Sequence, residues 1–165
     1  MLDDGDQKII VTQDDVRQIQ LAKGALYAGV KLLLDRGGVE SVDRIRLAGA
    51  FGSHIDIKYA MVLGLIPDCE LAAVSSAGNA AGTGARIALL DLSARTEIAS
   101  LVREVEKIET AIEPSFQAYF VDAMAFPNKR DEFPKLFSVI TRPPSKTALA
   151  DSSGRGNRRR RRPVA

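Results

Sequence analysis

Apolar residues recur at intervals of three and four between residues 12 and 35, which predicts a long amphipathic helix. Thr12 is a residue type that caps helix N-termini, and Gly37-Gly38 supplies a stop. Gly24 and Gly29 lie inside this helix, where each costs up to about 1 kcal/mol relative to alanine. Either another element or a ligand approaches closely there, or the two glycines are simply tolerated. The predicted apolar face consists of Val16, Ile19, Ala22, Leu26, Val30 and Leu33.

Two junctions from strand to helix follow this helix. Residues 42–48 predict a strand that runs into Gly49-Ala50-Phe51-Gly52, and residues 71–74 predict a second strand before Gly78-Asn79. Small-residue turns of this kind let backbone N–H groups approach a bound phosphate or sugar. The signal alone is weak, because the chain has only part of the dinucleotide fingerprint and no GxxxxGK[ST] loop. Turns that merely join strands to helices would look the same.

Further helices are predicted around and after these junctions. Asp56 is expected to cap a short helix that ends at Gly64, and an Ala- and Gly-rich helix is expected over residues 79–92. The glycines of that later helix suit tight backbone packing better than ligand contact. Ser93 is expected to cap the next helix, whose periodicity continues to Glu113. Pro114 then suits the first turn of another helix, in which Phe116, Phe120 and Met124 are interpreted as core residues.

The charge of the chain is divided unevenly along its length. From Thr141 onward there are eight basic residues and one acid, a net charge of +7, which leaves −5 for residues 1–140 out of the total of +2. Residues 141–165 are rich in Pro, Ser, Gly and Arg, so we expect a disordered tail without a specific partner. Residues 1–140 are mildly acidic, so nucleic-acid binding by the folded part is not indicated. No apolar run is long enough to predict a membrane span.

Cys69 and His54 are the only cysteine and the only histidine. An internal disulfide, an iron–sulfur cluster held by this chain, and a zinc site of several His and Cys ligands are therefore excluded. Because neither residue has a partner at ligand spacing, we predict that neither is catalytic or binds a metal.

Several motifs, in the right order, resemble the C-terminal domain of reductive activators of corrinoid-dependent enzymes, which belong to the actin-like ATPase superfamily. The resemblance covers roughly residues 8–137. It rests on the segment from Val11 to Leu26, on LAGAFG (47–52), GLIP (64–67) and GNAAGTGA (78–85), and on Phe126-Pro127. It implies an α/β fold: a partial actin-like ATPase (ribonuclease H-like) lobe over residues 1–140, helix-rich with a small, mostly parallel sheet. It also favours a strand near residues 105–110, where periodicity favours helix, and an early β-hairpin that is expected to be missing here.

The resemblance implies a function that this chain would carry out only in part. Such activators couple ATP hydrolysis to the reduction of Co(II) corrinoid proteins to Co(I) for methyl transfer, in the cytoplasm. The partner would be a corrinoid iron–sulfur or methyltransferase corrinoid protein. The [2Fe–2S] cluster would lie in N-terminal domains that this sequence lacks, so the chain is interpreted as a C-terminal fragment or split subunit. No catalytic residue is assigned to it.

The implied site is the nucleotide side of a cleft shared with those missing domains, which would hold ATP and Mg²⁺. The backbone of Gly49, Ala50, Phe51 and Gly52 would approach the adenosine or ribose, and Gly78 and Asn79 would line the cleft. Gln20 and Lys23, on the exposed face of the first helix, would flank the base. One alternative is a non-catalytic domain that docks on a corrinoid protein or on the parent chain. Another is an RNA-associated protein recruited by the arginine tail.

Overall fold

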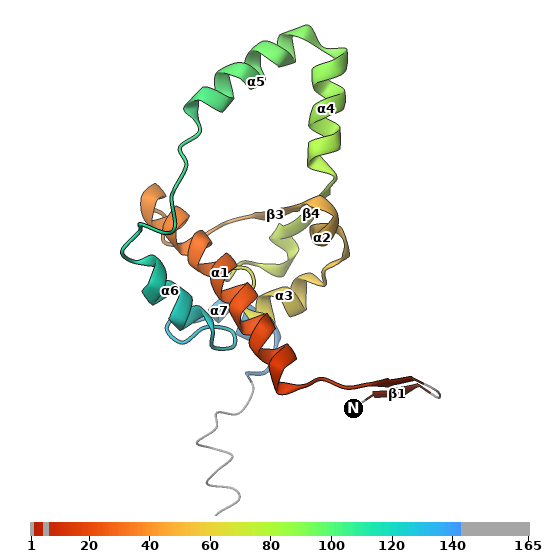
Figure 1. Ribbon diagram of the computed structural model, residues 1–165, viewed down its shortest axis with the longest axis vertical. Coiled ribbons are helices and arrows are strands. Elements are labelled where there is room, and N and C mark those ends of the chain that lie inside the picture. Colours follow the sequence, from red (N-terminus) through yellow and green to blue (C-terminus); the bar gives the residue numbers. More distant parts are fainter. Residues whose placement is uncertain (1, 5–6, 143–165) are drawn as a thin grey trace, which may run out of the picture.

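A computed structural model describes residues 2–4 and 7–142 of the chain. The chain opens with a short antiparallel hairpin of β1 (Leu2–Asp4) and β2 (Gln7–Ile9), so the expectation that no early hairpin is present was wrong. The long helix α1 (Gln13–Gly37) crosses the body, and two helices, α4 (Ala80–Leu90) and α5 (Leu92–Glu104), rise from the body as an arch (Figure 1). The predicted arginine-rich tail lies outside the described residues, apart from Thr141 and Arg142.

Helix α1 (Gln13–Gly37) begins and ends where the sequence predicts. Thr12 and Asp15 form a reciprocal capping box, and these hydrogen bonds hold the pKa of Asp15 below its usual value. Gly38 closes the helix in the left-handed conformation, at φ 61°. The local sequence therefore sets both ends of this helix.

The buried face of α1 differs from the predicted one. Val16, Ile19, Leu26 and Leu33 of the predicted apolar face are exposed. The helix instead packs against α6 (Phe116–Ala123) through a neighbouring face, which consists of Lys23, Gly24, Tyr27, Ala28 and Leu32. A Cβ at Gly24 would lie 3.3 Å from the carbonyl oxygen of Phe120, so this glycine permits the close approach that its position predicted. A Cβ at Gly29 would meet nothing within 4 Å.

The sheet of the body is a parallel pair, β3 (Ile45–Ala48) and β4 (Val74–Gly78). The second strand begins three residues later than predicted, because Leu71–Ala73 form a turn of 3₁₀ helix. The register slips between Leu47 and Ala48, so that Leu47 faces Ser76 and Ala48 faces Gly78. This irregularity places the last residue of β3 directly beside the glycine that ends β4.

The core lies between α1, the sheet and the C-terminal helices. It includes α3 (Ile57–Leu63), which is capped by Asp56 and Gly64 as predicted, and α7 (Pro134–Val139). The N-cap residue of α7 makes no side-chain hydrogen bond to the free backbone N–H groups at the start of the helix. The carboxylate of Asp68 accepts from the backbone N–H groups of Lys135 and Leu136 instead, both at 2.9 Å. Fully buried side chains of this core are Met61, Cys69, Phe133 and Leu136.

Helices α4 (Ala80–Leu90) and α5 (Leu92–Glu104) form the arch. Asp91, rather than Ser93, caps α5, and its carboxylate accepts from the backbone of Ser93 and Ala94. Residues 105–109 form neither the strand nor the continued helix that the sequence favoured; the chain runs extended there from Val105. Among the helices of residues 7–142, none has the length and apolar character needed to cross a membrane.

Candidate functional site

The two glycine turns predicted from the sequence lie side by side at the carboxyl ends of β3 and β4. We call the set Gly49, Gly52, Gly78 and Asn79 the glycine edge. Gly49 has φ 93° and Gly78 has φ 61°, a region that residues with a side chain rarely adopt. Because Ala48 pairs with Gly78, the two turns open at one edge of the sheet, where ligands bind in open α/β folds.

The two glycines of the LAGAFG motif have different structural roles. A Cβ on Gly49 would meet no heavy atom within 4 Å, so this turn faces open space. A Cβ on Gly52 would lie 2.8 Å from the backbone of Leu47, so Gly52 is required for α2 (Gly49–His54) to fold back onto β3. Gly49 is thus the residue of the motif that is free to admit a ligand, and Gly52 is a packing residue. Ala50 and Phe51 follow Gly49 in the first turn of α2.

Two serine hydroxyls connect the turns, a contact that no pattern in the sequence indicates. The Ser53 hydroxyl donates to the carbonyl of Gly49 at 3.1 Å. The Ser76 hydroxyl lies 3.5 Å from that of Ser53 and accepts from the N–H of Gly78 at 3.2 Å. These contacts link α2 to β4 and hold both glycines of the edge in place. Ser53 and Ser76 are 23 residues apart, so only the register of the strands could have paired them.

Asn79 has a structural task at the edge. Its side chain accepts from the N–H of Gly82 at 2.9 Å and so caps α4. A Cβ on Gly78 would meet nothing within 4 Å. At this turn, as at the first, the glycine is the residue with open space around its Cα.

Gln20 and Lys23 are held elsewhere, by the segment that follows α6. The Gln20 amide donates to the carbonyl of Met124 at 3.0 Å. Lys23 donates to the carbonyls of Ala125 and Pro127 at 2.5 and 2.7 Å, and its ammonium lies 4.8 Å from the centroid of the Phe126 ring. Lys23 is completely buried, so the expectation that it lies on the exposed face of the helix was wrong. The structure shows both side chains bonded to this segment and not to the glycine edge.

The burial of Lys23 lowers its pKa to about 8. Between pH 8 and 10 the folded chain has released this proton, whereas the unfolded chain retains it, so stability rises with pH in this window. We expect the free energy of unfolding of the native chain, measured in urea, to rise by about 2 kcal/mol relative to that of Lys23→Met across this range.

The difference between the two proteins isolates Lys23. Burial raises the pKa of Cys69 and that of Tyr27, and both groups therefore reduce stability at alkaline pH, but they are present in both proteins. Parallel stability curves for the native chain and Lys23→Met would show that the buried amine does not titrate near pH 8.

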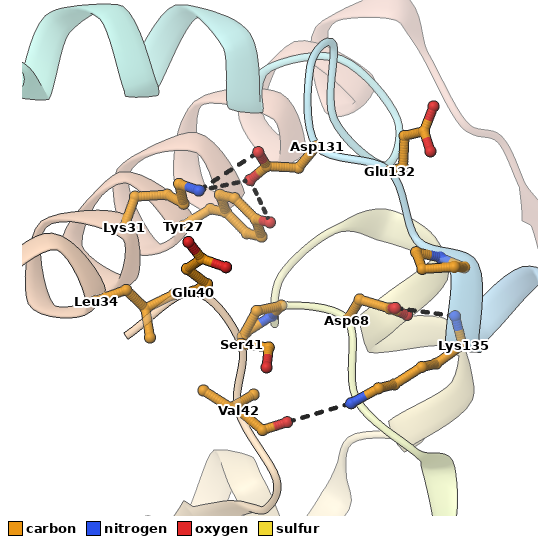
Figure 2. Close-up of a pocket in the computed structure, with 12 residues that line it drawn as sticks. Tyr27, Lys31, Leu34, Glu40, Ser41, Val42, Asp68, Asp131, Glu132 and Lys135 are labelled. Atoms are coloured by element: carbon orange, nitrogen blue, oxygen red, sulfur yellow. Dashed lines mark hydrogen bonds and ion pairs between the residues drawn. The ribbon is translucent and has the colours of Figure 1, made fainter. Parts of the chain in front are cut away.

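A polar cavity of about 270 Å³ lies between α1, the segment after it, and the segment before α7 (Figure 2). Asp131 accepts from the Tyr27 hydroxyl at 2.8 Å and lies 3.3 Å from the Lys31 ammonium. On the opposite wall, Asp68 caps α7 and the Lys135 ammonium reaches the carbonyl of Val42 at 3.5 Å. Most of the charged groups that line the cavity are thus bonded to the chain itself. We interpret the cavity as a structural junction.

The residues of the glycine edge fit a nucleotide held through backbone contacts. Both left-handed glycines leave free the space that a side chain would fill, and they are adjacent across the strand pair. Such a surface can approach a ribose or base closely. It offers no carboxylate of its own for a metal ion.

Comparison with known proteins identifies the family and the fold of the chain. Residues 2–137 match the family described as the C-terminal domain of RACo, the ASKHA domain. The chain is 42% identical over 119 residues to the corrinoid activation enzyme RamQ of Eubacterium limosum, a match that covers 70% of this chain and 20% of that enzyme. It also resembles the solved structure of a reductive activator for corrinoid, iron-sulfur protein, with a TM-score of 0.61 and 35% identity over 70% of this chain and 18% of that one.

The chain thus spans about a fifth of the length of these relatives and matches only their C-terminal domain. The predicted fold class is confirmed: the fold is an α/β actin-like domain, rich in helix, with a small parallel sheet. The chain belongs to the family of C-terminal ASKHA domains of the RACo type.

Proposed function

We propose that this chain supplies the C-terminal, nucleotide-side part of the ATPase domain of a cytoplasmic reductive activator that returns Co(II) corrinoid proteins to Co(I). The observation that carries the proposal is the pair of open, left-handed glycines at the ends of two adjacent parallel strands, in a chain whose family is the activator ASKHA domain. The actin-like ASKHA fold of the family supports a role in ATP binding. The partner of the assembled activator would be a corrinoid protein, as the names of the relatives indicate for those proteins.

In this proposal the chain's own residues position a nucleotide and do no redox chemistry. The backbone at Gly49 and Gly78 would contact the adenosine side, and Ser53 and Ser76 would keep the two turns in register. Groups that hold phosphate and Mg²⁺, and the [2Fe–2S] cluster that supplies one electron to cobalt, would belong to the rest of the activator. ATP hydrolysis in the assembled activator would supply the energy for the reduction to Co(I).

A chimera tests this function. The matched 119-residue segment of the Eubacterium limosum enzyme is replaced by the corresponding segment of this chain, and ATP-dependent reduction of a Co(II) corrinoid protein is followed by its visible spectrum. We expect the chimera to be active and the isolated chain to turn over no ATP. The same enzyme without any C-terminal segment is the control. A folded chimera that binds no ATP and reduces no corrinoid would contradict the proposal.

The alternative of a non-catalytic docking domain is favoured by one observation, the exposed apolar arch of α4 and α5. A chimera in which nucleotide binding at the glycine edge is abolished separates the two functions. If the chain is a docking domain, the activator would still assemble and work. If the chain has the proposed function, corrinoid reduction would be lost.

A further inference from the structure

The arch of α4 and α5 exposes an apolar surface that the rest of this chain does not cover. Within the described part of the chain, neither helix contains a buried residue. Figure 1 shows both helices standing away from the body. The large apolar side chains that this leaves exposed, with accessibilities between 40% and 84%, are Ile87, Leu89, Leu90, Leu92, Ile98, Leu101 and Val102.

These helices need a partner for physical reasons. They contain 11 and 13 residues, and helices of this length are marginal in water without tertiary packing. Ala94, Ile98 and Leu101 fall on one face of α5, the pattern of a helix that buries one side. Helix α4 has only Thr83 and Arg86 as polar residues, which is typical of a helix buried on most sides.

Two neighbouring features of the body are left incomplete in the same way. Parallel sheets are usually covered on both faces, yet Ser75 and Ala77 of the two-stranded sheet are exposed. The outer face of α1 is also uncovered and, with Ile108 of the segment after α5, forms an apolar groove of about 350 Å³ beside Leu26 and Leu33. The arch, the sheet and α1 therefore each leave part of their surface uncovered.

We propose that the arch, together with this groove, is the docking surface for the preceding part of the activator ATPase domain; this rests on the proposed function. The family match runs through the whole arch, so the arch belongs to the shared domain. The relatives contain about four times as much additional chain, which is enough to cover it. The arch also rises directly from Asn79 at the glycine edge, so a lobe seated on it would lie beside the proposed nucleotide site.

Amide hydrogen exchange of the isolated chain and of the chimera tests this docking surface, without ATP or corrinoid present. We expect the amides of α4 and α5 to exchange rapidly in the isolated chain and to be protected at least about tenfold in the chimera. Slow exchange in the isolated chain that depends on its concentration would assign the arch to a second copy and overturn the proposal. Unprotected arch amides in a folded chimera would also overturn it.

A matched pair of variants supplies a second measurement. Leu101→Glu on the arch and Val139→Glu on α7 each place a charge at a position with about 60% exposure. In the isolated chain both should leave the melting temperature nearly unchanged. In the chimera, Leu101→Glu should lower it by several degrees and Val139→Glu should not. Equal effects of the two variants in the chimera would contradict the docking surface.

The two proposals can fail separately. A chimera that protects the arch but reduces no corrinoid would retain the docking surface and reject the function. An active chimera whose arch stays unprotected would do the opposite.

Discussion

Gly64→Ala is expected to destabilise the fold by about 3 kcal/mol or more, through backbone strain and overpacking together. Gly64 ends α3 at φ 71°, where an alanine costs about 1–2 kcal/mol for the left-handed conformation alone. The added Cβ would also overlap the carbonyl oxygen of Pro127 and would lie 3.1 Å from the Lys23 ammonium. A backbone carbonyl cannot move aside as a side chain can, so the junction between α3, α1 and the segment after α6 would have to open.

Urea unfolding followed by circular dichroism measures this effect. Gly29→Ala is the matched control, because a Cβ there meets nothing within 4 Å and lies inside a regular helix. That variant should be neutral or more stable by up to about 1 kcal/mol. If Gly64→Ala and Gly29→Ala unfold at the same urea concentration, the close packing at Pro127 does not exist in solution.

Gly49→Val should weaken ATP binding by the chimera by at least about a hundredfold. The turn at Gly49 is the open position of the glycine edge, and a valine there would fill the space through which a nucleotide reaches the backbone. Isothermal titration of the chimera with ATP measures the loss.

The control for Gly49→Val has to introduce the same backbone strain at a position outside the glycine edge. Gly38→Val does so, because Gly38 also has a positive φ and open space around its Cβ, but it ends α1. It should cost stability and leave ATP affinity unchanged. Equal affinities of a folded Gly49→Val chimera and the unmodified one would exclude the glycine edge as the nucleotide site.

Features set by neighbouring residues could be predicted from the sequence. The caps Thr12, Asp56 and Gly38 act within one turn of their helices, and each lies where it was predicted. The glycine turns after both strands were found for the same reason. The start of β4 was misplaced because Leu71–Ala73 continues the apolar run of the strand but forms a 3₁₀ turn.

Features set by distant partners could not be predicted. Periodicity identified an apolar stripe on α1, but which stripe faces this chain's own body depends on α6, where Gly24 lets Phe120 approach. The predicted apolar stripe of α1 is exposed in this chain. The helical pattern predicts a surface position for Lys23, because nothing local indicates the carbonyls of Ala125 and Pro127 that bind it. In the candidate site, the Ser53–Ser76 contact depends likewise on strand register.

The hydrogen bonds of α1 have a consequence for synthesis on the ribosome. Gln20, Lys23, Tyr27 and Lys31 all find their partners 100 to 104 residues later. At about 5–20 residues per second, the emerging helix waits roughly 5–20 s before those partners are made. During that time both of its faces, the one later buried by α6 and the apolar one, are available to chaperones. A ribosome that stalls before Phe116 would release a chain in which that helix has neither α6 nor any of these hydrogen-bond partners.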